Sequence, residues 1–371
     1  MHDAASIAYA NPAFWRVYNQ MHAHDASDLA PLLKILCPLL SVHKGTLSVL
    51  IVGVGTGTVE LPLLAGMQSL LPEKSITVDC IDRSDVALGI LGSRLRTPDW
   101  GLTADATKQC EVFIPQTEEF HQARSRDITF NLLKLDVDRA SADPARPEYD
   151  FPSSWAFHET IKDKSYDLVI AAFSLLHIHF WNPVLRQILA HLVKDGIFIH
   201  PKALGDEVIW ESACRRNKYK TRAERVFLDV VYREEDAREF ARQNKGITAG
   251  NPDSINVFLD SMVAAGYLRM IECCPFYTYS RMPIPATAYP GLLATRGFGL
   301  FRKLESVIGV AAYDSIVDES SRLIKRIGGS DRLNLEIHWD IYQLSVDPRM
   351  AHFLTIQRKS ETICAHCFAR V

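Results

Sequence analysis

Three glycines at alternating positions, Gly53, Gly55 and Gly57, constrain the fold of this chain more than any other feature. They follow the apolar run 47–51, which is typical of a buried strand, and precede an apolar segment with helical spacing. Glycine lets the backbone turn sharply and lets a ligand approach closely, because it has no Cβ. The first turn of the next helix offers free backbone N–H groups. The pattern therefore predicts a strand, a tight turn and a helix that form one side of a nucleotide pocket.

The spacing of these glycines distinguishes two kinds of nucleotide site. Dinucleotide-binding folds carry the pattern G-x-G-x-x-G, which places a pyrophosphate at the helix N-terminus. The pattern in this chain is G-x-G-x-G. An NAD-dependent oxidoreductase is therefore a weak alternative.

Strand-like and helix-like segments alternate over the first two hundred residues. The strand-like runs are 48–52, 76–81, 128–135, 168–173 and 196–200, and 183–193 has helical spacing. This alternation predicts a parallel sheet covered by helices on both faces, with ligands bound beyond the carboxyl ends of the strands. The polar segments 99–126 and 138–164 are expected to be loops or short insertions.

Composition excludes some classes of protein. The chain has 371 residues, of which 47% are hydrophobic, and a formal net charge of -3. No strong basic field is available for a phosphate backbone, so a nucleic-acid partner is not expected. No apolar run approaches the roughly 20 residues of a membrane-spanning helix, so no membrane partner is expected. The eight cysteines have scattered spacing and no secretory leader precedes them, which predicts reduced thiols in a cytoplasmic protein.

Cys364, His366 and Cys367 form a cluster of metal-ligating types near the C-terminus. A structural zinc site needs four ligands, usually from two such groups. The other close pair is Cys273-Cys274, and adjacent cysteines are poor ligands of one ion. No metal is therefore expected.

The ordered set of motifs resembles the class I S-adenosylmethionine (SAM)-dependent methyltransferase family over roughly residues 45–200, with a weaker similarity to the end of the chain. The matching segments are 49–57, the strand ending at Asp82, the strand ending at Asp136, 166–177 and 192–199. Ile51 departs from the pattern, because the family often has Asp or Glu two residues before the first glycine. A backbone carbonyl or a water could take the place of that carboxylate at the methionine ammonium.

The resemblance implies an α/β fold with a Rossmann-like, seven-stranded sheet, helices on both faces and an antiparallel last strand. Residues 268–273 and 352–357 are expected to supply the final two strands. The expected domains are an N-terminal helical lid at 1–40, a SAM-binding core at 41–275 with a helical insertion at about 205–250, a substrate-capping insertion at 276–345, and the final strand and tail at 346–371.

The resemblance also implies a set of residues that bind SAM. Asp82 would accept hydrogen bonds from the ribose hydroxyls, although it could instead cap the following helix. Asp136 would lie beside the adenine amine, a place that Asp138 could take instead. The expected cofactor-binding residues are Gly53, Val54, Gly55, Gly57, Asp82, Arg83, Asp136, Val137 and Phe173.

His177 follows a buried strand and is the candidate catalytic base. Methyl transfer depends mainly on alignment, however, and a base is often dispensable. The aromatic residues of the N-terminal helix, including Phe14, Trp15 and Tyr18, either close over the pocket, where their ring faces suit a sulfonium, or pack in the core.

Alternation over 336–340 separates two sets of side chains. We expect Ile337 and Trp339 in the core, with Glu336, His338 and Asp340 in water; in the alternative, this polar face lines the pocket and orients an acceptor.

Together these features predict an enzyme that transfers a methyl group from SAM to an O or N nucleophile of a small organic molecule by in-line displacement. The large insertions favour an enclosed pocket and hence a small acceptor. Two alternatives stay open, namely a methyltransferase that acts on protein or RNA, and a non-catalytic SAM-binding or interaction module. A homodimer also stays open.

Overall fold

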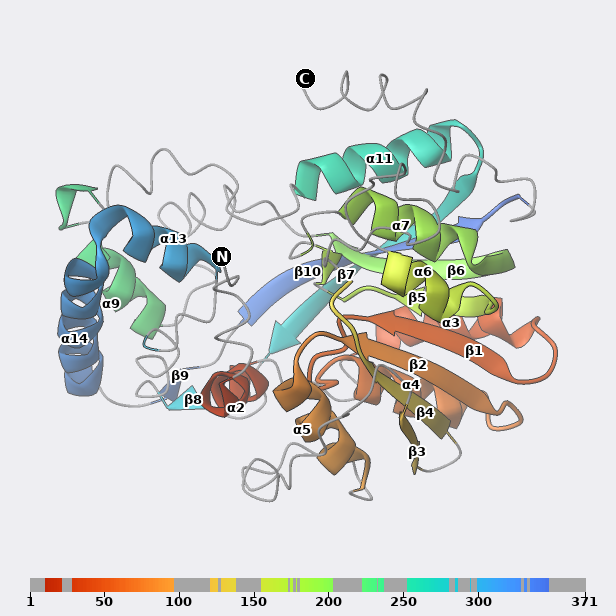
Figure 1. Ribbon diagram of the computed structural model, residues 1–371, viewed down its shortest axis with the longest axis horizontal. Helices are drawn as coiled ribbons and strands as arrows, with labels where there is room; N and C mark the ends of the chain where they lie inside the picture. Colours follow the sequence, from red (N-terminus) through yellow and green to blue (C-terminus); the bar gives the residue numbers. More distant parts are fainter. Residues whose placement is uncertain are drawn as a thin grey trace.

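A mixed sheet of eight strands organises the computed structural model (Figure 1). The structure describes residues 11–21, 29–96, 121–125, 128–137, 155–172, 174–175, 178, 181–202, 222–231, 233–236, 252–279, 284–285, 294, 299–327, 330–331 and 334–346. The strands are β1 (Leu47–Val52), β2 (Ile76–Asp82), β3 (His121–Ser125), β4 (Ile128–Lys134), β5 (Tyr166–Ile170), β6 (Leu192–Lys202), β7 (Leu268–Tyr279) and β10 (Asn334–Leu344). Two short strands, β8 (Ile284–Pro285) and β9 (Ser330–Asp331), pair separately.

The strand order is β3-β4-β2-β1-β5-β6-β10-β7. β4, β2, β1, β5 and β6 pair in parallel, whereas β10 is antiparallel to both β6 and β7. Without the edge strand β3, the order reads 3-2-1-4-5-7-6 with the seventh strand antiparallel, which matches the Rossmann-like methyltransferase fold. The predicted sheet is therefore confirmed, with one more strand than expected.

Helices cover both faces of this sheet (Figure 1). One face packs against α3 (Ala30–Ser41), α4 (Glu60–Leu70) and α5 (Asp85–Leu95). The other packs against α6 (Trp155–Ile161), α7 (Trp181–Ala190) and α11 (Pro252–Ala264). Central strands are buried on both sides, so in β1 Val49 and Ile51 belong to the first core and Leu50 and Val52 to the second. This double burial explains why β1 is a continuous apolar run.

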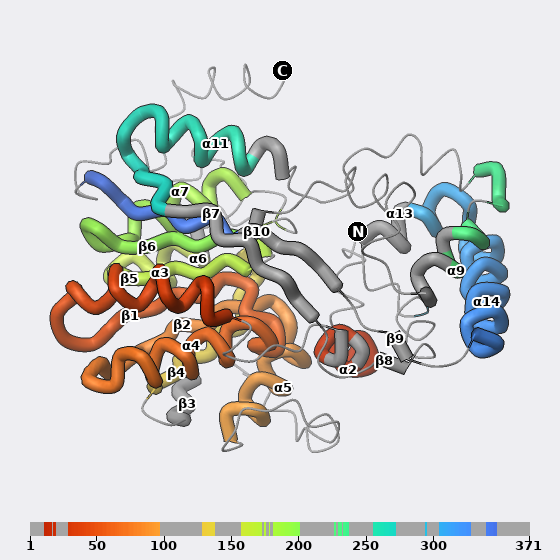
Figure 2. Tube along the Cα trace, turned by 180° about the vertical axis from the view of Figure 1, so that it is seen from behind, coloured from red at the N-terminus to blue at the C-terminus, as the bar shows by residue number. Residues whose placement is uncertain are grey.

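A group of helices lies to one side of the sheet, beyond the ends of β7 and β10 (Figures 1 and 2). It consists of α9 (Arg222–Val231), α13 (Gly299–Ile308) and α14 (Val310–Ile327). α9 packs on α14 through an apolar stripe that includes the buried Phe227, Val230 and Val231. α13 and α14 lie in the chain between β7 and β10, within the range 276–345 that was expected to cap the substrate, whereas β10, which falls in the same range, belongs to the sheet.

The segments expected to be loops contain two elements. β3 lies within 99–126 and pairs antiparallel with β4, so it covers an edge of the sheet that would otherwise be exposed. α6 lies within 138–164, and its Phe157 and Ile161, four residues apart, are both buried against the sheet. The prolines at 144, 147 and 152 come before this helix, so they indicate a loop only for the first part of the segment 138–164.

The position of the last strand also needs correction. β10 occupies the place between β6 and β7 that was expected for 352–357, a segment outside the described residues. Trp339 and Asp340, on opposite faces of β10, are 0% and 2% exposed. The expectation of Asp340 in water is therefore wrong, because the strand lies inside the sheet and both its faces are covered. Trp339 is in the core as expected, and the side chains of Glu336, Ile337 and His338 lie outside the described ones.

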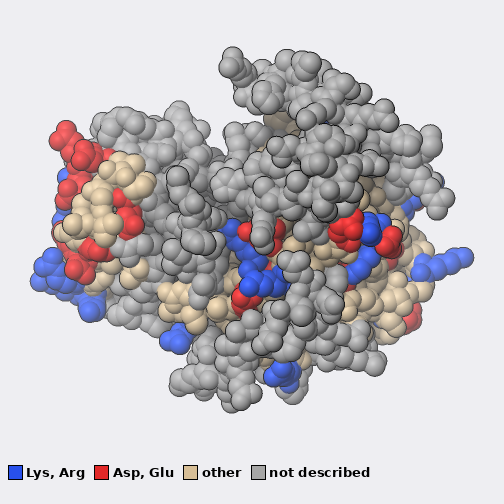
Figure 3. All heavy atoms as spheres, in the orientation of Figure 1, with Lys and Arg blue, Asp and Glu red and all other residues tan. Residues whose placement is uncertain are grey.

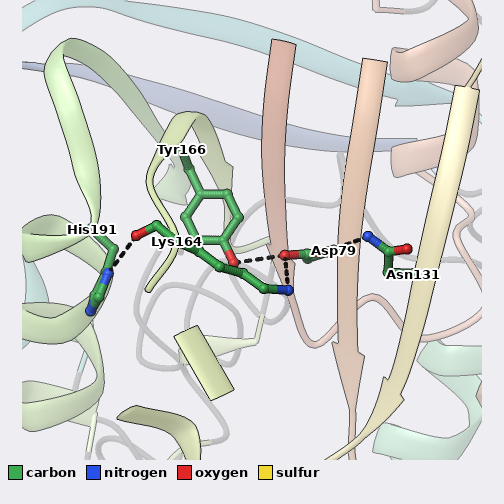
Figure 4. A network of polar contacts seen from close by, with 5 residues as sticks. All are labelled: Asp79, Asn131, Lys164, Tyr166 and His191. Carbon is green, nitrogen blue, oxygen red and sulfur yellow. Dashed lines mark hydrogen bonds and ion pairs between the residues drawn. The ribbon is translucent and has the colours of Figure 1, made fainter. Parts of the chain in front are cut away.

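A buried polar network connects three strands on the α6–α7 face of the sheet (Figure 4). The carboxylate of Asp79, in the middle of β2, is 4% exposed and accepts hydrogen bonds from Asn131 Nδ2 (2.6 Å), Lys164 Nζ (2.7 Å) and Tyr166 Oη (2.8 Å). The backbone oxygen of Lys164 also lies 2.9 Å from Nδ1 of His191. Burial, followed by the charge of Asp79, raises the pKa of Tyr166, so its hydroxyl stays protonated and donates. Because a buried carboxylate is costly without partners, each donor stabilises the fold.

Substitution Tyr166→Phe tests this network. It removes one donor from a buried carboxylate, and we expect it to lower the free energy of unfolding by about 1–3 kcal/mol. The control is Lys162→Ala, which breaks an exposed ion pair with Glu159 and should leave stability unchanged. Urea unfolding of both variants is the measurement. Equal midpoints for Tyr166→Phe and the wild type would show that the network does not stabilise the fold.

Candidate functional site

A pocket opens at the carboxyl ends of the parallel strands, where α/β sheets bind ligands. Its walls come from the segments that follow β1, β2, β4 and β5, from the first turn of α4, and from α2 (Pro12–Met21). Most of the residues expected to bind SAM line it: Gly53, Val54, Gly55, Asp82, Arg83, Asp136 and Val137. Segments far apart in the sequence therefore meet at one place.

The glycine loop between β1 and α4 has the geometry that its sequence predicts. Gly53 and Gly57 have φ angles of 71° and 72°, a region that non-glycine residues rarely adopt. A Cβ on Gly53 would lie 2.3 Å from Cβ of Ser174, so the missing side chain allows the segment after β5 to approach the loop. A Cβ on Gly57 would lie 2.8 Å from Leu91 and 2.9 Å from Leu61. Gly57 thus serves the packing of α4 against α5 and is not among the residues that line the pocket.

Asp82, at the end of β2, joins the glycine loop to the start of α5. Its side chain is buried, Oδ2 accepts a hydrogen bond from the backbone N–H of Gly55 (2.7 Å), and Oδ1 accepts one from Ser84 (2.8 Å). The helix cap is Ser84 itself, whose hydroxyl oxygen accepts from the backbone N–H of Ala87 (3.1 Å). Burial raises the pKa of Asp82, while the Ser84 and Gly55 N–H groups and the charge of Arg83 oppose that rise. A carboxylate oxygen accepts more than one hydrogen bond, so both oxygens retain capacity toward the pocket.

The N-terminal helix α2 forms another wall of the pocket. Asn11 Oδ1 accepts from the backbone N–H of Ala13 (2.9 Å), an arrangement typical of a helix start. Phe14 and Trp15 are 1% and 6% exposed, and their ring centroids lie 5.1 Å apart in an edge-to-face contact. Both rings, together with Tyr18, line the pocket. Phe14 and Trp15 are therefore buried and also line the pocket, while the role of the rings toward a ligand stays a prediction.

Contact between α2 and the glycine loop is both polar and apolar. Thr56 Oγ1 donates to Oδ1 of the buried Asn19 over 2.5 Å, and Cζ3 of Trp15 would lie 3.4 Å from a Cβ on Gly55. Arg94 of α5, 1% exposed, donates from Nη1 to the backbone oxygen of Thr56 (2.6 Å). The loop is thus held from α2, β2 and α5.

Glu60 and Arg94 are buried charges that the sequence interpretation missed. Glu60 is 4% exposed, begins α4 and lines the pocket. Burial raises its pKa to about 7, against the lowering effect of backbone N–H groups and of Arg94. Burial lowers the pKa of Arg94 to about 10, so it keeps its positive charge at neutral pH. In the sequence, Glu60 is the single charged residue of a long apolar stretch, and Arg94 comes at the end of another apolar run, so a buried position could have been suspected for Glu60.

The structure does not describe the remaining residues that were expected at the site. Phe173, His177 and Asp138 lie outside the described residues. Opposite Asp340, His200 of β6 is 1% exposed, and burial lowers its pKa to about 4, so it is neutral at pH 7. No group of three or more His, Cys, Asp or Glu side chains within the described ranges could hold a metal ion. Each described helix is too short or too polar to cross a bilayer.

Comparison with known proteins finds similarity only among solved structures. No protein-family model and no curated protein matches the sequence. Loganic acid methyltransferase, solved with S-adenosylhomocysteine (SAH), is 8% identical, with 93% of this chain and 98% of that chain covered and a TM-score of 0.45. Phosphoethanolamine N-methyltransferase 2 of Haemonchus contortus, solved with SAM, is 13% identical with a TM-score of 0.30. That comparison covers 86% of this chain and 52% of the other, so this chain spans about half the length of the Haemonchus enzyme.

The similar structures include a protein with a different activity. The [4+2]-cyclase SpnF is 15% identical, with 84% of this chain and 81% of that chain covered and a TM-score of 0.31. All three likenesses are distant. The strand order, with its antiparallel seventh strand, is what identifies the fold as that of the methyltransferases.

Substitution Gly53→Ala tests the close approach at the glycine loop. Gly45 provides a matched control, because it has a similar φ of 78° but a Cβ added to it would meet nothing within 4 Å. Both alanine variants force a left-handed conformation that costs about 1–2 kcal/mol. Only Gly53→Ala adds the overlap with Ser174, so we expect a further loss of about 1–3 kcal/mol in its free energy of unfolding. Urea unfolding measures both, and equal losses would contradict the geometry.

Proposed function

We propose that this protein is a SAM-dependent methyltransferase that acts on an O or N nucleophile of a small organic molecule. The observation that supports it most is the pocket, in which the glycine loop, Asp82 and Asp136 line one space at the carboxyl ends of β1, β2 and β4. The pocket belongs to a sheet with the strand order of the methyltransferases. The cofactor, the reaction and the class of acceptor form the proposal.

The charges of the pocket suit SAM. Glu60, Asp82 and Asp136 line the described part of it, against one guanidinium, that of Arg83. SAM carries a sulfonium and an ammonium beside its single carboxylate, so an acidic lining favours it. The buried aromatic rings of α2 offer faces to a cation, an interaction worth about 0.5–2 kcal/mol. Carboxylates as buried as Asp82 and Glu60 gain from a cation that arrives with the ligand.

Each residue of the pocket then has a role in binding and alignment. When bound, SAM supplies a methyl group that is already activated for displacement. Asp82 already accepts hydrogen bonds from the backbone N–H groups of Gly55 and Ser84. Its carboxylate oxygens would accept further hydrogen bonds from the ribose hydroxyls. Asp136, after β4, would lie beside the adenine amine, and α2 would exclude water. His177 is proposed as the base that accepts the acceptor's proton.

A small acceptor is favoured over a macromolecule. α2 adds a wall of aromatic side chains to the pocket at the glycine loop. On the face drawn in Figure 3, Lys and Arg side chains of the described residues lie among Asp and Glu and do not form a continuous basic patch. RNA binding depends on such a patch. The inserted helices α13 and α14 would complete the cap over the acceptor.

Parallel calorimetric titrations with SAM, SAH and NAD test the proposal. We expect micromolar dissociation constants for the two sulfur ligands and no heat from NAD. If neither sulfur ligand binds, the methyltransferase proposal is wrong. If both sulfur ligands bind but no acceptor can reach the methyl group of SAM, the alternative of a non-catalytic SAM-binding module would be supported.

Substitution Asp82→Asn tests the proposed ribose contact. The amide loses the negative charge and one acceptor, so we expect SAM affinity to fall by about 1.5–3 kcal/mol, roughly 10- to 150-fold in the dissociation constant. Asp163→Asn, at an exposed carboxylate, is the control and should bind as the wild type does. Calorimetry provides the affinities, and circular dichroism establishes that both variants are folded. An unchanged affinity in folded Asp82→Asn would refute the contact.

A further inference from the structure

We propose that Glu60 is the carboxylate that binds the ammonium group of the methionine part of the cofactor. This inference rests on the proposed function, since it assigns one end of the same ligand. β1 offers no carboxylate for that purpose, because Ile51, two residues before the first glycine, is apolar and 0% exposed. Glu60 is the acidic side chain that the structure places on the other side of the glycine loop.

The position of Glu60 follows from how α4 begins. The N-cap residue is Val59, whose side chain makes no cap hydrogen bond. Glu60 is the first residue of the helix, and its Oε2 accepts a long hydrogen bond of 3.3 Å from the backbone N–H of Val59. The carboxylate is therefore held at the helix start, where the helix dipole favours negative charge, and it lines the pocket.

The surroundings of Glu60 do not fully compensate its charge. Burial raises its pKa to about 7, although the N–H groups of residues 59 and 60 and the charge of Arg94 lower it. Asp82, a like charge on β2, raises the pKa further. Arg94 also donates to the backbone oxygen of Thr56 (2.6 Å), so it is shared with the glycine loop. A cation entering the pocket would supply the compensation that is lacking.

Glu60 and Asp82 accept hydrogen bonds from two different places on the glycine loop. Asp82 accepts from Gly55 near the first turn, and Glu60 accepts from Val59 where the loop enters α4. A ligand with its ribose at Asp82 that lies along the loop brings its amino-acid end to α4. Asp82 would thus bind the ribose of the ligand, and Glu60 would bind its amino-acid end.

A purely structural role for Glu60 makes different predictions. If it only stabilises the start of α4 and the buried Arg94, its loss would weaken the whole site. The affinity of every ligand would then fall by a similar factor, whether or not the ligand carries an ammonium group. If it binds the ammonium, only ligands that carry this group should lose affinity.

Two ligands separate these roles: SAH, which has the ammonium, and 5′-methylthioadenosine, which shares the adenosine but has no amino-acid part. We would titrate both into the wild type, Glu60→Gln and the exposed-site control Glu73→Gln. We expect Glu60→Gln to weaken SAH at least about tenfold, in keeping with the loss of one charge-assisted hydrogen bond, and to leave methylthioadenosine within about twofold. Glu73→Gln should change neither.

Proton release gives a second readout that needs no variant. Near pH 6.5 a carboxyl with a pKa of about 7 is mostly protonated, and a bound ammonium favours its charged form, so SAH binding should release a proton. Calorimetry in two buffers of different ionisation enthalpy measures this release. Among the described residues, the ionisable groups that interact with Glu60 include Asp82, Arg94 and Cys80, and the last two keep one charge state near this pH. Asp82 contributes equally with both ligands, because both carry the ribose.

The outcomes distinguish the two proposals. Equal weakening of both ligands in Glu60→Gln, or no proton release beyond that with methylthioadenosine, would overturn the role of Glu60. If Glu60→Gln binds SAH as the wild type does, the role is likewise overturned while the proposed function stands. If the wild type binds neither ligand, the proposed function itself has failed.

Discussion

The hydrogen bond from the backbone N–H of Gly55 to Oδ2 of Asp82 joins the end of β1 to the end of β2, and the pocket depends on it. It fixes the glycine loop against the neighbouring strand while the other carboxylate oxygen fixes the start of α5 through Ser84. The same side chain thus shapes the loop and lines the ligand space. Because Asp82 is buried, its hydrogen bonds are made in a medium of low polarity, where they are stronger than in water.

Around this contact, the fold gathers buried polar and charged side chains that would be costly without partners. Arg94 reaches the loop from α5, Asn19 reaches it from α2, and Glu60 lines the pocket from α4. In the middle of β2, by contrast, Asp79 has three donors and needs no ligand. Asp79 is therefore a buried carboxylate that stabilises the fold, whereas Glu60, which lines the pocket, is available for binding. On this account the acidity of the pocket is its main means of selecting a cationic cofactor.

The sequence predicts the parallel strands, the glycine loop and the place of Asp82 at the end of β2, because each depends on local pattern. β1 is apolar at every buried position, and β2 ends in an acid that stands two residues before a helix cap. It does not predict β10 as the last strand, since the buried Asp340 makes an interior strand resemble a half-exposed one. The sequence analysis also misses Glu60 and Arg94, because their contacts with the loop and the pocket depend on how α4 and α5 pack in the fold. The role of His177 stays a prediction.

A crystal structure of the protein with SAH bound is the most direct test of this account. We predict the ribose hydroxyls within hydrogen-bonding distance of Asp82 and the ammonium within that distance of Glu60, with the aromatic rings of α2 over the ligand. A ligand bound elsewhere, or in this pocket with its amino-acid end away from α4, would contradict the account.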